Sequence, residues 1–168
     1  MTKSIFYLIL ILGVFALFKF FLEKYFSEKK KIYTYRSKES FMTSAEREFF
    51  GVLKSAIGEK YQIFAQVHLP TILDCKINGQ NWHGAFRHID EKSVDFVLCD
   101  SISLKPLLAI ELDDKSHDEE SRQLRDEEVE RIFKEANLPL LRFENHGQYD
   151  QAGIARRIDE VLDVTKLA

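Results

Sequence analysis

An unbroken apolar run opens the chain, and its length limits what it can be. Residues 4–18 read SIFYLILILGVFALF without a charge, and the run continues to Leu22 with Lys19 as its one interruption. That span is near the ~20 residues that a helix needs to cross a bilayer, and a lysine can reach the headgroups from within it. A secretory signal peptide is the alternative, but Lys3 is the single basic residue before the run and no small-x-small cleavage site follows it. The pattern predicts an uncleaved transmembrane anchor over residues 1–23.

Helical spacing begins again after residue 40. Thr43 and Glu46 have the spacing of a capping box, and apolar residues recur three and four positions apart until Gly58. Residues 61–69 are rich in β-formers and predict a strand that Pro70 ends. Residues 74–90 contain an Asn-Gly pair and many polar residues. They predict a loop with a short helical turn.

The second half of the chain alternates between strand and helix patterns. Residues 93–100 and 106–112 are β-rich and separated by SISLK, a connection short enough to favour antiparallel pairing. Residues 118–137 predict a helix with a left-handed C-cap at Asn137, since Pro139 follows. A strand over 138–143 and a last amphipathic helix from about residue 151 complete the pattern. The order predicts an α/β fold with a mixed central sheet flanked by helices, in one domain over residues 41–168.

Charge and cysteine content add a topology and restrict the partners. The net charge of −3 gives no overall attraction to nucleic acid, so such a partner needs a local basic surface. Residues 24–40 form a basic linker after the apolar run. The positive-inside rule therefore predicts a single-pass protein of the inner (cytoplasmic) membrane, with its C-terminal domain in the cytoplasm. Cys75 and Cys99 lack zinc or disulfide spacing, which predicts reduced thiols. The oligomeric state is left open.

Acidic residues interrupt or end two of the predicted strands. Asp95 lies inside an apolar run, where an aspartate needs a partner, a cation or an exposed position. Glu111 and Asp113 are two residues apart and share one face if the strand persists. If the two strands pair, these three carboxylates can hold Mg²⁺ or Mn²⁺, and Lys115 and His117 follow closely enough to supply a cation and a proton-transfer group. The plainer alternatives are a solvated turn at Asp113, an exposed strand residue at Glu111 and an ordinary first-turn helix residue at His117.

Several stretches resemble one bacterial family. Residues from about 40 to 143 are similar to the family called domain of unknown function 2726, a branch of the PD-(D/E)XK nuclease-like superfamily, and the acidic strand end also resembles very-short-patch-repair-type endonucleases. The matching stretches are TSAEREFFGVL, FAQVHL, VDFVLCD, LLAIELDDKSH and RDEEVERIFKEANLPLLRF. The resemblance implies a restriction-endonuclease-like α-β-β-β-α-β core and Mg²⁺-dependent hydrolysis of nucleic acid, with DNA as the favoured substrate and RNA left open.

By position, the resemblance implies that Asp95 is the first metal-binding aspartate and Glu111 the second acid. Asp113 takes the place of the superfamily's lysine, which is thought to orient the attacking water. An aspartate cannot do so as a cation. His117 is then the better candidate for proton transfer, and Lys115 could serve only if a turn redirects it. Glu46 aligns with an acid on the first helix of many such nucleases, but its capping-box role already explains it.

The remaining site candidates have structural alternatives. Gln66 could contact the site or simply end its strand. Arg122 and Arg125 could bind phosphates or pair with acids of their own helix. Three hypotheses follow: a membrane-anchored, metal-dependent nuclease, a catalytically inactive nucleic-acid-binding module of the same fold, and a membrane-tethered interaction protein with solvated acids.

Overall fold

A computed structural model describes residues 2–26, 33–113 and 119–167, with the side chains at residues 2, 25, 26, 119–125 and 165–167 outside the description. The chain divides into two compact units, Met1–Lys38 and Glu39–Ala168. Each unit has its own architecture.

The first unit contains helix α1, Thr2–Phe26. Its described side chains are exposed all around the helix, and most of them are apolar. A helix that is apolar on every side has no polar face to turn toward water. The segment Lys3–Lys24 is long and apolar enough to cross a membrane, with a mean hydropathy of 2.6, although a signal sequence has the same properties.

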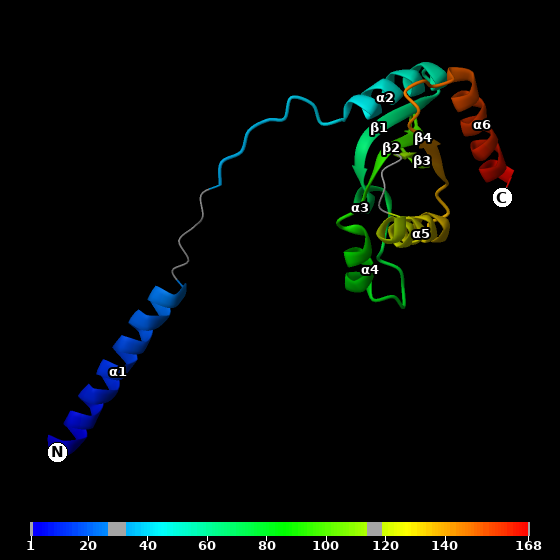
Figure 1. The fold of residues 1–168 in the computed structure, drawn as a ribbon. Coiled ribbons are helices and arrows are strands. Elements are labelled where there is room, and N and C mark those ends of the chain that lie inside the picture. Colours follow the sequence, from blue (N-terminus) through cyan, green and yellow to red (C-terminus); the bar gives the residue numbers. More distant parts are fainter. Residues whose placement is uncertain (1, 27–32, 114–118, 168) are drawn as a thin grey trace. The chain divides into compact units, whose positions relative to one another are not determined.

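The second unit is built on a four-stranded mixed sheet (Figure 1). Its strands are β1 (Tyr61–His68), β2 (Ser93–Asp100), β3 (Pro106–Asp113) and β4 (Leu140–Glu144), in that spatial order. The first three are antiparallel neighbours, and β4 runs parallel to β3. This confirms the predicted antiparallel pair on either side of SISLK and the mixed sheet.

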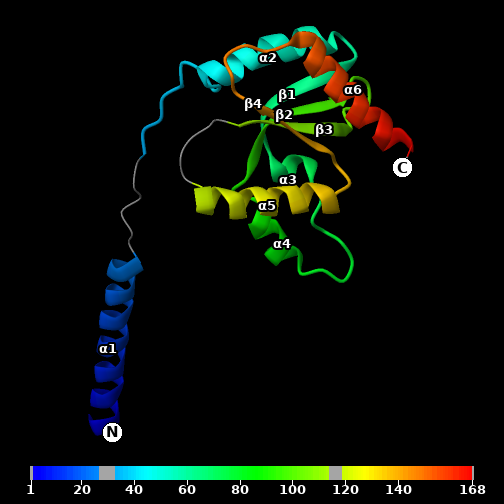
Figure 2. The same ribbon diagram turned by 45° about the vertical axis from the view of Figure 1, so that its right-hand side comes forward.

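Helices cover both faces of this sheet (Figure 2). One face carries α2 (Ser44–Ile57) and α6 (Gln151–Leu167), and the other carries α3 (Leu69–Ile72), α4 (Trp82–Ile89) and α5 (Glu119–Glu135). Because strand side chains alternate between faces, there are two cores. The first joins α2 and α6 to the sheet through residues such as Phe49, Phe96 and Phe143. The second joins Val97 and Ala109 to α5 and the short helices.

Two local predictions are confirmed by the geometry of the helix ends. Thr43 and Glu46 form a reciprocal capping box at the start of α2, with Glu46 Oε2 accepting the Thr43 N–H at 2.9 Å. Asn137 has a φ of 51° after α5, as expected of a left-handed cap.

The region between β1 and β2 differs in part from the prediction. Pro70 ends β1 by starting α3, where its missing N–H costs no hydrogen bond. The short helical turn predicted within residues 74–90 is present as the two-turn helix α4 over residues 82–89, whose N-cap Asn81 accepts the Gly84 N–H at 3.3 Å. A short helix packed on one side leaves little periodicity for a sequence pattern to detect.

Candidate functional site

Asp95 lies at the end of the sheet where β1, β3 and β4 finish and β2 begins. Toward this end, the last residues paired between β2 and β3 are Phe96 and Ile110. Asp95 and Glu111 occupy the next positions, where the Oδ2 atom of Asp95 accepts the backbone N–H of Leu112 at 2.8 Å. A side chain thus replaces a backbone partner as the strands separate. The aspartate is fixed by the sheet rather than free on its surface.

Glu111 and Asp113 lie on one face of β3, as their spacing predicts, and both contact Arg142 of β4. The parallel register pairs Glu111 directly with Arg142. The guanidinium lies 2.9 Å from Glu111 Oε2 and 3.0 Å from Asp113 Oδ1. A bond between a guanidinium and carboxylates is among the stronger hydrogen bonds in proteins. The two acids of the β3 end are therefore joined by an internal cation.

Arg142 also reaches α5, which covers this face. Its Nη2 atom lies 3.4 Å from Asp126 Oδ1, and its Nε atom lies 3.8 Å from Glu130 Oε1. Among the described residues the Nε atom is buried and makes no hydrogen bond. One guanidinium is therefore shared among four carboxylates of the described chain. The cluster keeps an excess of negative charge.

The pKa shifts follow from burial and from this excess. Burial raises the pKa of Glu111 to about 7; Arg142 opposes the shift, and Asp95, Asp113 and Asp126 add to it. Burial also raises the pKa of Asp95, against the bond from Leu112. Burial disfavours the charged form of Arg142, but its carboxylate neighbours outweigh burial and raise its pKa. The Arg142 guanidinium therefore stays charged. Because several carboxylates share it, it does not fully offset the cost of burying the Glu111 carboxylate. Carboxyl groups with raised pKa values are common at functional sites.

Gln66 and Glu46 both lie close to Asp95. The Gln66 side chain hydrogen-bonds to Asp95 and works against the rise in its pKa, whereas the charge of Glu46 adds to that rise. Gln66 therefore contacts the candidate site, one of the two alternatives that its position in the sequence allowed. Glu46 combines its capping-box bond with a place near the acids.

Four predicted site residues cannot be placed. Lys115 and His117 lie outside the described residues, in the segment between β3 and α5. Arg122 and Arg125 belong to α5, but their side chains lie outside the description.

Arg142 is the residue that sequence reasoning missed. It interrupts the apolar stretch LPLLRF in the same way that Asp95 interrupts SVDFVLCD. A charged residue inside a short strand needs a partner, and that signal was available. Its partners were not, because they follow from the parallel pairing of β3 with β4.

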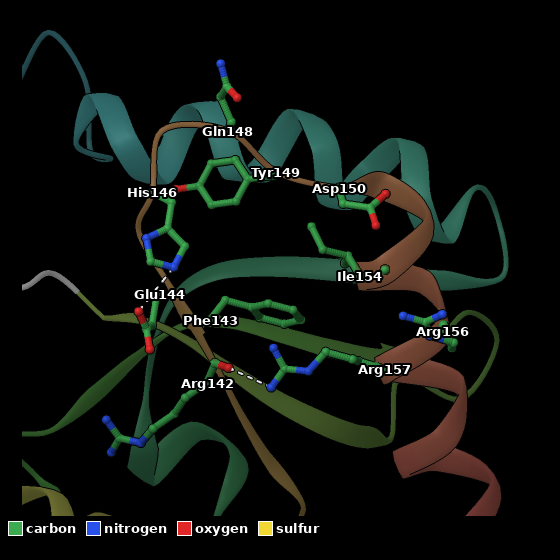
Figure 3. Close-up of a pocket in the computed structure, with 11 residues that line it drawn as sticks. Arg142, Phe143, Glu144, His146, Gln148, Tyr149, Asp150, Ile154, Arg156 and Arg157 are labelled. Carbon is green, nitrogen blue, oxygen red and sulfur yellow. Dashed lines mark hydrogen bonds and ion pairs between the residues drawn. The ribbon is translucent and has the colours of Figure 1, made fainter.

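A second arginine fastens the edge strand that carries Arg142. Figure 3 shows the Arg142 guanidinium pointing away from Arg157, whose own guanidinium reaches the Arg142 backbone. The Nη2 atom of Arg157 donates to the Arg142 carbonyl at 3.0 Å, and its guanidinium lies 4.5 Å from the centre of the Phe143 ring. These contacts line a cavity of about 400 Å³ between β4 and α6. Because the Arg142 carbonyl at the edge of the sheet already accepts the bond from Arg157, it is not available to pair with another strand.

The donor atoms of Asp95, Glu111 and Asp113 are hard oxygens of the kind that Mg²⁺ and Mn²⁺ prefer. Within the part of the chain that the structure describes, no group of three or more His, Cys, Asp or Glu side chains is already positioned to hold a metal ion. The oxygen atoms of these acids are of the kind that such an ion binds, and a bound cation would offset their surplus negative charge and favour the charged forms of Asp95 and Glu111, whose pKa values are raised. In the conformation described, the side chain that bridges Glu111 and Asp113 is Arg142.

The fold and site define a mixed α/β domain whose sheet end is lined by partly buried carboxylates. The family model described as protein of unknown function (DUF2726) matches residues 38–162, and the chain belongs to that family. No curated protein and no solved structure matches the chain.

Proposed function

We propose that this protein is a membrane-anchored, metal-dependent nuclease with a restriction-endonuclease-like core, hydrolysing phosphodiester bonds of nucleic acid, most simply DNA. The observation that carries the proposal is the group formed by Asp95, Glu111 and Asp113 at one sheet end. Burial and mutual repulsion raise the pKa of two of these carboxyls. Burying several carboxylates together is unfavourable unless a cation or a proton neutralises them. The resemblance of the sequence to PD-(D/E)XK nucleases and to very-short-patch-repair-type endonucleases favours metal-dependent hydrolysis of a phosphodiester bond as the reaction.

The three acids would hold Mg²⁺ or Mn²⁺. When bound, such an ion lowers the pKa of coordinated water and offsets charge on a phosphate. The chain's own residues then divide the remaining work. Leu112 fixes the Asp95 carboxylate through its N–H, and Gln66 holds the same carboxylate from β1. His117 is the candidate for proton transfer and Lys115 the candidate cation, with Arg122 and Arg125 as phosphate contacts.

A catalytically inactive module of the same fold, binding nucleic acid or another partner, is the second candidate. One observation favours it: Arg142 already bonds Glu111 and Asp113, so the acids have a counterion of their own. Asp113 in the place of the superfamily's lysine supports the same view. The two candidates differ in whether the acids support cleavage of nucleic acid when a metal ion is supplied.

The proposed location is the inner membrane, with one span and the domain in the cytoplasm. It rests on the apolar helix Lys3–Lys24 and on the basic residues that follow it. A reporter that works only outside the cytoplasm, fused after Ala168, should be inactive. An active fusion would show that the domain lies outside the cytoplasm and would contradict the proposed topology.

The decisive experiment titrates Mg²⁺ and Mn²⁺ into the full-length protein in detergent micelles and measures DNA and RNA cleavage together with metal binding. Asp95→Asn should abolish both, while its amide oxygen can still accept the Leu112 N–H and keep the fold. His117→Ala should lower cleavage by ~10²–10⁴-fold and leave metal affinity nearly intact. Asp159→Asn, an exposed acid paired with Lys60, is the matched control and should change neither.

The outcomes separate the two candidates. A wild-type protein that binds Mg²⁺ and nucleic acid but cleaves neither DNA nor RNA with either metal ion is the inactive module. A protein that binds no metal ion, with Asp95→Asn indistinguishable from wild type, would rule out the metal-dependent nuclease.

A further inference from the structure

An apolar groove lies beside the acidic sheet end, over β1 and β2. It has a volume of about 470 Å³, which is within the range of pockets that hold small ligands. Its floor includes Val97 and Cys99, which are buried members of the second core. Its rim includes Phe64, which is 42% exposed, and Leu104, which is 52% exposed. Large apolar side chains gathered around an open groove are a usual sign of a binding surface.

The groove and the acids are continuous through Gln66. This residue lines the groove. It stands opposite Asp95 in the antiparallel pairing of β1 with β2, where its side chain interacts with the Asp95 carboxyl and works against the rise in its pKa. The groove floor belongs to the core on the α3–α5 face, the face on which Glu111 meets Arg142 and α5. A ligand in the groove would therefore have one end beside the carboxylates.

Backbone strain marks the part of β1 that lines the groove. In the described chain three residues other than glycine have a positive φ: Gln66 at 53°, Leu104 at 57° and Asn137 at 51°. Asn137 is a helix cap, where this conformation is ordinary. Leu104 ends the turn between β2 and β3, where a left-handed residue is common in a hairpin loop. Gln66 lies inside β1 and lines the groove, and a glutamine does not favour the left-handed region. Conformations of this kind cluster at ligand-binding sites.

We propose that this groove binds one unpaired nucleobase of a nucleic-acid strand whose adjacent phosphate lies at the acids; the inference rests on the proposed function. A base is flat and apolar on its faces and polar at its edge. Phe64 offers a ring for stacking, as aromatic side chains do in proteins that bind single strands. Gln66 offers an amide that can both donate and accept at the base edge. The remaining lining is mostly apolar, with His68 and Thr71 as its other polar members.

The test measures binding of a short single-stranded DNA to the full-length protein in micelles with Mg²⁺. A second strand of the same length carries abasic residues, so it has the same phosphates without bases. Wild type should bind the strand with bases more tightly. Phe64→Ala should weaken that binding by about 5- to 150-fold, the range for loss of one base–aromatic stack, and should leave the abasic strand unaffected.

Two further variants keep the result interpretable. Leu104→Asn retains a residue that tolerates a positive φ and removes an apolar wall, so it should weaken binding of the base-containing strand in the same direction. Phe86→Ala removes a phenylalanine of similar exposure, 37%, on α4 and should have no effect. Intactness of the strand is checked on a gel, and cleavage is scored separately.

Failure of this inference differs from failure of the proposed function. If the strand is cut but Phe64→Ala binds both strands like wild type, the groove does not take a base and the nuclease proposal stands. If the strand is never cut but the base-dependent loss occurs, the groove proposal holds for an inactive module. Equal wild-type affinity for both strands, or a dimer that Phe64→Ala turns into a monomer, would assign the groove to another occupant and overturn the proposal.

Discussion

The two faces of the sheet are made by alternate residues of the same strands, yet they bury different things. On the α2 and α6 face, Phe96 and Phe143 pack around Phe49 in an apolar core. The other face also has an apolar core, around Val97 and Ala109. Toward the end of β3, however, this core gives way to Glu111 and Arg142, which carry opposite charges beneath α5. An apolar face gains free energy simply from leaving water, whereas a charged one gains only if every charge finds a partner. The first face can hold the fold together. The second can be occupied by a site.

The largest effect on this comparison should come from breaking the apolar face. Phe49 is fully buried, with ring centres of Phe96, Phe143 and Tyr149 between 5.0 and 5.6 Å from its own. Phe49→Ala should lower the free energy of unfolding by about 3–5 kcal/mol, because a cavity replaces the ring. Urea unfolding of the full-length protein in micelles, followed by Trp82 fluorescence, measures it. Phe41→Ala, at an exposed position, is the control. If Phe49→Ala and Phe41→Ala lowered the free energy of unfolding equally, the core around Phe49 would not be a main source of stability.

Removing the internal cation should have the next largest effect. Arg142→Gln leaves partly buried carboxylates without their counterion, which should cost about 3 kcal/mol near pH 8. Arg131→Gln is the matched control, because this exposed arginine makes an (i, i+4) pair with Glu135 worth roughly 0.3–0.5 kcal/mol. If the acids also bind a metal ion, Mg²⁺ should stabilise Arg142→Gln more than it stabilises wild type. An equal response to Mg²⁺ in both proteins would count against competition between ion and guanidinium.

The smallest effect is a dependence of stability on pH that arises from Glu111 at the acidic end of the sheet. The pKa of Glu111 is about 7 in the folded chain, above its ordinary value of 4.5. The folded state therefore holds this proton more tightly, and its contribution is complete below about pH 4.5 and is lost as the pH rises to about 7. We expect a loss of about 2 kcal/mol across that window.

Urea unfolding at several pH values measures this contribution. Glu111→Gln should flatten the curve between pH 4.5 and 7, whereas Glu160→Gln, at an exposed position of α6, should leave it unchanged. A curve for Glu111→Gln that still falls as steeply as wild type would assign the titration to another group.

Much of the framework could be predicted because its signals are local. The capping box of α2, the Asn137 cap and the alternation of strands and helices depend on residues a few positions apart. The pair Glu111 and Asp113 shares a face because strand side chains alternate. The bounds of helix α4 could not be predicted within residues 74–90, because two turns carry too few residues to establish a period.

The sequence by itself determined the elements, the apolar first helix and the acids at the strand ends, because periodicity and short spacing are properties of consecutive residues. The tertiary structure decided what those acids meet. Arg142 lies 31 residues beyond Glu111 in sequence and faces it only through the parallel pairing of β3 with β4. Gln66 meets Asp95 only through the antiparallel pairing of β1 with β2. Burial, which sets the pKa of Glu111, also depends on helices far away in the chain. Charges at a site are fixed by distances in space, and no local pattern records them.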